Sequence, residues 1–136
     1  MQVNQITRSF KITEHFTIGE MACKCGCNIP NDVYENLKLL CTKLEELRKE
    51  LGKPITVISQ YRCDKRNKAV GGAPKSQHKY GRAADLVVSG MEPEEVAKVA
   101  LKLKFKGVGI YDTFCHVDIR KSLWTAKWDK RTKKKD

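Results

Sequence analysis

The chain has 136 residues, of which 40% are hydrophobic, and its formal net charge is +11. This length fits one domain that buries enough apolar surface to fold without disulfides. No apolar run reaches the roughly 18 residues of a membrane span, and residues 1–5 have no apolar signal segment, so we expect neither a membrane span nor a cleaved leader. A basic surface suits an anionic polymer. The few aromatic residues are not interleaved with the basic ones, so we expect no nucleic-acid partner.

The first half of the chain predicts one long helix and one strand. Residues 6–19 form an entry segment that reads either as alternating strand or as short helix starts, and residues 23–30 form a turn-rich loop. A helix then begins at Asn31 or Asp32 and ends at Gly52, because leucines recur every three or four positions, at 37, 40, 44, 47 and 51. Residues 55–59 are β-branched and predict a buried strand, followed by a loop with a helical turn near residues 65–70.

The second half predicts a sheet with one more helix. Strands are expected at residues 83–88, 107–111 and 114–120, and a helix at residues 92–104 with proline in its first turn. Asp112 and Thr113 make the turn between the last two strands. The sequence therefore predicts an α+β fold, a mainly antiparallel sheet with helices packed on one side. We expect one domain over residues 1–128, ended by Trp124 and Trp128, and a basic, disordered tail over residues 129–136.

Six cysteines are many for a chain without a signal sequence. Three lie in the run Cys23-Lys24-Cys25-Gly26-Cys27, and the others are Cys41, Cys63 and Cys115. Six cysteines allow 15 pairings, and the spacing does not form two C-x-x-C knuckles. We favour reduced thiols and keep a disulfide and a cysteine-bound metal as alternatives. His15 is expected to be a surface or capping residue.

Three residues have the chemistry of a catalytic metal site. His78 lies seven positions before Asp85, and His116 follows in the next strand pair. Imidazole and carboxylate suit Zn²⁺, and a catalytic zinc keeps three protein ligands and one open position. We therefore expect one Zn²⁺ ion on His78, Asp85 and His116, at the sheet.

The motif Ser76-x-His78-x-x-Gly81-x-Ala83-x-Asp85, followed by His116-x-Asp118, resembles the zinc D-alanyl-D-alanine carboxypeptidases. This family of peptidoglycan-cleaving metallopeptidases includes VanX-like dipeptidases and phage endolysins. The likeness is to its small single-domain branch and covers roughly residues 14–124. Its further motifs here are Ser59-Gln60-Tyr61-Arg62, with glutamine where the family more often has glycine, Asn67, Val70-Gly71-Gly72 and Gly107-x-Gly109-Ile110-Tyr111.

The resemblance implies a zinc peptidase that cleaves peptidoglycan stem or cross-link peptides as a carboxypeptidase or an endopeptidase. We expect a monomer that stays in the cytoplasm of the producing cell and acts on the wall after release, like a phage or prophage lysin. A catalytically silent wall-binding module of the same fold is the first alternative, and a basic nucleic-acid-binding protein is the second. Like Hedgehog-type domains, such a module would keep the site without turnover.

The general base is the open part of the predicted site. Many relatives have an acid three positions before the last histidine, where this chain has Thr113. Asp118 is favoured as base because residues 116 and 118 share a strand face, and Asp112 is the alternative. Asp118 could instead orient a histidine or pair with Arg120.

The remaining predicted site residues surround the metal. Arg62 is assigned to the oxyanion by resemblance. Cys115 should face away from the zinc by strand alternation. The candidate substrate contacts are Ser76, Tyr61, Asn67 and Tyr80.

Overall fold

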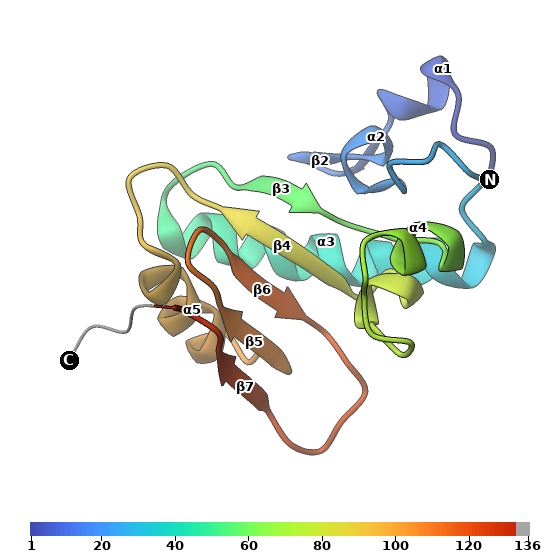
Figure 1. Ribbon diagram of the computed structural model, residues 1–136. Helices are drawn as coiled ribbons and strands as arrows, with labels where there is room; N and C mark the ends of the chain where they lie inside the picture. Colours follow the sequence, from blue (N-terminus) through green and yellow to red (C-terminus); the bar gives the residue numbers. More distant parts are fainter. Residues whose placement is uncertain (133–136) are drawn as a thin grey trace.

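The computed structural model describes residues 1–132 and shows a five-stranded sheet with helices on it (Figure 1). The strand order is β3-β4-β6-β5-β7, and a separate two-stranded sheet, β1-β2, lies near the N-terminus. The helices are α1 (Gln5–Arg8), α2 (Ile18–Met21), α3 (Asn31–Leu51), α4 (Asp64–Ala69) and α5 (Pro93–Lys102), with a 3₁₀ turn, η1 (Gln77–Tyr80). The strands are β1 (Lys11–Thr13), β2 (Phe16–Thr17), β3 (Thr56–Ser59), β4 (Ala83–Val87), β5 (Gly107–Ile110), β6 (Cys115–Asp118) and β7 (Ala126–Asp129).

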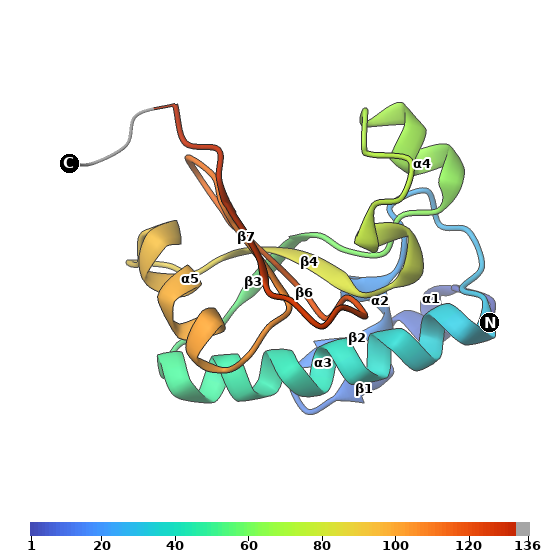
Figure 2. The same cartoon turned by 90° about the horizontal axis from the view of Figure 1, so that it is seen from below.

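The sheet separates a buried layer from an open face. Helix α3 covers one side, and α4 rises on the opposite side (Figure 2). Helix α5 packs against β5, β6 and α3. The pairs β3–β4, β4–β6 and β5–β6 are antiparallel, whereas β5–β7 is parallel. The predicted α+β class and the mainly antiparallel sheet are therefore confirmed, and the parallel strand β7 is an addition that the sequence did not predict.

The leucine stripe of α3 supplies most of the helix side of the core. Leu37, Leu40, Leu44 and Leu47 are fully buried, as the spacing predicted. Burying each leucine contributes about 1.5–3 kcal/mol relative to an exposed side chain. The helix ends at Gly52, which has a φ of 68°, a left-handed conformation that glycine adopts without steric cost. Within residues 1–132, no helix combines the length and apolar character needed to cross a bilayer.

Strand β3 corrects the prediction of a buried strand. It lies at the edge of the sheet and, within residues 1–132, pairs only with β4. Its side chains are exposed or half-buried, and Ile58 is 38% exposed. A short run of β-branched residues is typical of edge strands as well as central strands. The sequence pattern therefore could not show that β3 lies at the edge of the sheet.

The N-terminal segment combines both predicted readings, because it holds two short helices and a two-stranded sheet. Glu45 on α3 anchors this sheet. It accepts hydrogen bonds from Thr13 Oγ1 and from the His15 backbone N–H, both at 2.7 Å, and its other oxygen lies 2.6 Å from His15 Nδ1. His15 is exposed and is not part of the His78–Asp85–His116 group, in line with the expected surface role.

The C-terminal boundary differs from the expected one at residue 128. Asp129 belongs to β7, and the Lys130 backbone N–H donates to the Ile110 carbonyl at 2.8 Å. Arg131 pairs with Glu94 at 3.1 Å. Residues 129–131 are held by these contacts to β5 and to α5. Residues 133–136 of the expected tail lie outside the described residues.

Candidate metal centre and active site

Sheet register brings the centre of the site together. Asp85 on β4 pairs with His116 on β6, and His116 pairs with Gly109 on β5. Gly109 in turn pairs with Trp128 on β7. Paired residues on neighbouring strands project from the same face of a sheet. The row therefore places a carboxylate, an imidazole and an indole side by side on the open face.

His78 reaches this row from η1. Gly81 ends η1 with a φ of 71°, and a Cβ there would lie 2.8 Å from Val33 of α3, so the turn can pack closely on the helix. His78 Nδ1 lies 2.9 Å from the Gln60 carbonyl oxygen, and Nε2 lies 3.3 Å from Asp85 Oδ1. A carbonyl can only accept, so Nδ1 carries the proton and Nε2 presents its lone pair to the site.

His116 is oriented in the same way by Asp118. His116 Nδ1 lies 2.9 Å from Asp85 Oδ1, and its Nε2 donates to Asp118 Oδ2 at 2.7 Å. Arg120 grips the same carboxylate, with Nε donating to Oδ1 at 2.9 Å and Nη2 donating to Oδ2 at 2.7 Å. A carboxylate behind a metal-binding histidine sets its tautomer and raises its basicity. Asp118 therefore acts on His116 from the side away from Asp85.

The three predicted ligands fit a zinc ion. His78, Asp85 and His116 each offer one ligand atom, and these three atoms lie within 4.8 Å of one another. All three groups are buried. Each histidine uses its second nitrogen for an acceptor outside the cluster, which is the usual support of a metal-binding imidazole. Burial would raise the pKa of Asp85, but the adjacent imidazoles of His116 and His78 lower it well below its usual range. The carboxyl is thus ionised, as a metal ligand must be.

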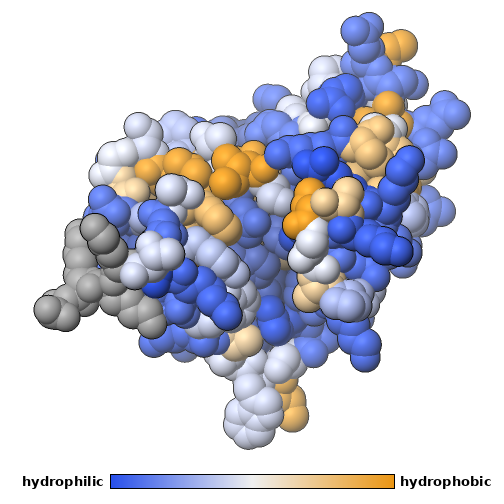
Figure 3. Space-filling model, in the orientation of Figure 1, coloured by the Kyte–Doolittle hydropathy of each residue, from blue (hydrophilic) through white to orange (hydrophobic). Residues whose placement is uncertain are grey.

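An open cleft of about 550 Å³ leads to these ligands. Its face is mostly hydrophilic and hollowed near the centre, with hydrophobic atoms in small separate groups (Figure 3). Arg62 and the loop of residues 70–77 form one wall. The opposite wall is formed by Tyr111, Phe114, Arg120 and Trp128. A groove of this shape can accept an extended peptide across the ligands.

Trp128 is a wall residue that sequence reasoning missed. Gly109 has no Cβ, and one there would lie 2.3 Å from Trp128 Nε1, so the indole lies directly over the glycine. The indole ring is 5.1 Å from the His116 ring, and Nε1 donates to Tyr111 Oη at 2.9 Å. The Gly107-x-Gly109 motif was the available signal, because glycine in a strand often marks a close approach of another group.

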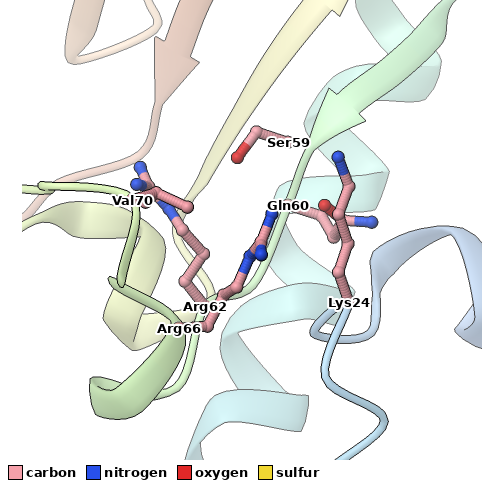
Figure 4. A pocket seen from close by; sticks show the side chains of 6 residues that line it. All are labelled: Lys24, Ser59, Gln60, Arg62, Arg66 and Val70. Carbon is pink, nitrogen blue, oxygen red and sulfur yellow. The ribbon is translucent and has the colours of Figure 1, made fainter. Parts of the chain in front are cut away.

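Arg62 lines the same cleft as His78, Asp85 and His116. It also borders a second pocket with Lys24 and Arg66 (Figure 4). Burial lowers the pKa of Arg62. Among the described residues, its buried Nε has no hydrogen-bond partner. A buried, unpaired donor of a charged group has a high cost unless a ligand satisfies it, so Arg62 is suited to an anionic group of a substrate.

Only one of the four predicted substrate contacts lines the cleft. That residue is Ser76, whose Oγ also accepts from the His78 backbone N–H at 3.3 Å. Tyr61 is buried in the hydrophobic core, and Asn67 donates to the Ala73 carbonyl at 2.9 Å, which shapes the loop. Tyr80 stacks under Arg82. None of these three residues lines the cleft, since residues near each other in sequence need not point to the same side of the backbone.

Neither candidate base faces the open side of the ligands. Asp118 is fully buried and holds His116 and Arg120. Asp112 is exposed and accepts from the Thr132 backbone N–H and Oγ1, at 2.9 and 3.0 Å. In residues 1–132, Asp85 is the one carboxylate that lines the cleft. The geometry therefore corrects the preference for Asp118 as base and favours the orienting role. Cys115 lies in the core, facing away from the ligands as expected.

Two histidines and an aspartate at the floor of an open cleft in an α+β fold form a candidate metal-binding site of the kind found in metallopeptidases. A family model described as Peptidase M15 matches residues 14–119, which is most of the chain. The chain belongs to the M15 family of metallopeptidases.

Curated relatives match a shorter part of the chain. The peptidoglycan L,D-endopeptidase MepK of Escherichia coli (strain K12) is 36% identical over 73 residues, which cover 48% of this chain and 40% of MepK. The MepK proteins of Escherichia coli O157:H7 and Shigella flexneri match to the same extent. The match thus spans less than half the length of these relatives.

Proposed function

We propose that this protein is a zinc-dependent peptidase that hydrolyses a peptide bond in the cross-links of bacterial peptidoglycan. The observation that carries the proposal is the buried His78–Asp85–His116 cluster, oriented from behind and open to a cleft. Similarity to an L,D-endopeptidase supports an endopeptidase rather than a carboxypeptidase. The net charge of +11 supports a polymer rich in carboxylates as the substrate.

Different residues of the cleft would have different roles in hydrolysis. His78, Asp85 and His116 would hold a zinc ion, which would supply a Lewis acid for the scissile carbonyl and for a water molecule. Arg62 places a fixed positive charge beside the ligands, where negative charge develops on the carbonyl oxygen during attack. Trp128 and Tyr111 form the opposite wall, so they position the peptide and exclude water from that side.

The test is digestion of purified sacculi and of cross-linked muropeptides of known structure, followed by mass spectrometry. We expect cleavage that stops when a chelator removes zinc and returns when zinc is added. The masses of the two products identify the bond. His116→Ala is the matched control and should bind the metal poorly and cleave nothing. A wild-type protein that contains zinc at His78, Asp85 and His116 but leaves every cross-link intact would contradict the proposal.

That negative result would support the second candidate, a wall-binding module without turnover. One observation favours it, namely that Asp112 and Asp118 are both engaged away from the open side of the ligands. Binding to insoluble peptidoglycan, measured by pelleting, would then persist without any released product.

A further inference from the structure

Four cysteines that are separated in the sequence converge at one place next to the cleft wall. Cys23, Cys25 and Cys27 come from the loop after α2, and Cys63 immediately precedes α4. One sulfur atom from each lies within 4.8 Å of the other three. The Cys63 sulfur lies 3.7 Å from that of Cys23 and 3.5 Å from that of Cys25.

These separations match the edges of a metal tetrahedron. Zinc–thiolate bonds of about 2.3 Å place two sulfurs of a tetrahedral site about 3.8 Å apart. A disulfide would instead bring one pair to about 2.05 Å and leave the other two thiols without a role. All four residues are free thiols in the structure. Four mutually adjacent sulfurs are the donor set of a closed, structural zinc site.

The backbone around the cluster is shaped to hold the sulfurs together. Gly26 has a φ of 78°, and its N–H donates to the Cys23 carbonyl at 3.0 Å, which closes a tight turn over residues 23–26. Cys63 Sγ accepts from the Arg66 backbone N–H at 3.4 Å. Such N–H groups stabilise a thiolate, because they place partial positive charge beside the sulfur.

The surroundings also supply positive charge. Four thiolates and one Zn²⁺ carry a net charge of −2. Lys24 lies between two of the cysteines in the chain, and Arg62 directly precedes Cys63. With Arg66, these side chains line one pocket beside β3 (Figure 4). The cations reduce the electrostatic cost of a doubly negative centre at this position.

We propose that Cys23, Cys25, Cys27 and Cys63 bind a second zinc ion, which has a structural role and is separate from the ion on the histidines. Binding displaces the protons of the four thiols to solvent. The ion links the N-terminal loop to the segment that carries Arg62. Two hydrogen bonds join the same two segments, from Gln60 Nε2 to the Glu20 carbonyl at 3.0 Å and from the Tyr61 N–H to the Met21 carbonyl at 3.3 Å. The second ion therefore fixes the position of Arg62 at the cleft.

The test counts metal in the full chain, purified with a reductant. Native mass spectrometry and elemental analysis should find two zinc ions per chain in the wild type. His116→Ala and Cys25→Ser should each retain one, and the double variant none. Cys41→Ala and Cys115→Ala are matched controls that should retain two, because these cysteines are buried in the core and do not belong to the four-cysteine cluster.

A second measurement needs no cysteine variant. His116→Ala loaded with Co²⁺ should show the sulfur-to-cobalt charge-transfer absorption of a thiolate site. The proposal is overturned if this absorption is absent, if the wild type holds only the zinc that His116→Ala removes, or if the intact mass shows a disulfide within the cluster. Each of these outcomes is independent of whether the protein cleaves peptidoglycan.

Discussion

Asp118→Asn tests the role of the carboxylate behind His116. The substitution keeps the size of the side chain but removes its charge. In the structure this carboxylate accepts from His116 Nε2 at 2.7 Å and from two nitrogens of Arg120. Loss of such an orienting partner weakens metal binding by about 10–100-fold, or about 1.4–2.7 kcal/mol. We therefore expect weaker zinc binding, with turnover restored to within a few-fold of the wild type when zinc is saturating.

The assay separates this role from general base catalysis. Zinc affinity is measured by competition with a fluorescent chelator, and cross-link cleavage is measured across a zinc titration. Asp112→Asn is the control, because this exposed residue contacts Thr132 and should change neither quantity. Thermal unfolding in excess zinc checks that the variant is folded. If Asp118→Asn binds zinc normally and has lost turnover at every zinc concentration, Asp118 is the base and our interpretation is wrong.

Three further predictions concern the walls of the cleft and the N-terminal sheet. Arg62→Ala should keep zinc on the histidines but lose about a hundredfold or more in turnover. Arg62→Lys should restore only part of the turnover, because lysine lacks the planar guanidinium that forms two parallel hydrogen bonds. Unchanged kinetics would remove Arg62 from the mechanism. Gly109→Ala should lower turnover and change tryptophan fluorescence, since a Cβ 2.3 Å from Trp128 Nε1 must push the indole by more than about 1 Å to reach ordinary contact; a normal emission spectrum with full activity would contradict this. Glu45→Gln should lower the free energy of unfolding by about 1 kcal/mol at neutral pH. Burial would raise the pKa of Glu45, but hydrogen bonds from Thr13 and His15 lower it, so its contribution is present above the unfolded pKa and is lost as pH falls. Denaturant melts should therefore show a difference at pH 7 that shrinks below about pH 4, and a constant difference would count against this reasoning.

Sequence patterns predicted those elements of the fold that depend on residues close to one another in the chain. The leucine spacing of α3 and the capping glycine at residue 52 determine a helix without reference to the rest of the chain. The proximity of His78 and Asp85 was also predictable, because both belong to one short motif. Strand β7 was not, since its parallel pairing with β5 depends on an open edge created elsewhere in the fold.

The functional details that the sequence did not predict all depend on which residues a side chain contacts in the folded chain. His116 and Asp118 share a face, as expected, but only the structure shows that the second nitrogen of His116 points to the carboxylate. Cys63 is far in sequence from the Cys23–Cys27 run, so spacing alone left a metal, a disulfide and free thiols open. Trp128 lies in a lysine-rich stretch, and this charged composition did not predict strand β7.

The position of β7 in the chain has a consequence for biosynthesis. This strand supplies the indole wall, and it is the last in chain order of the strands in residues 1–132. His78, Asp85, His116 and Arg62 all precede it, so the metal ligands do not depend on β7 for their place in the chain. The cleft is complete only once the chain extends to residue 129 and β7 pairs with β5. A chain that stalls or is truncated before this point retains the metal ligands without the surface that positions the substrate.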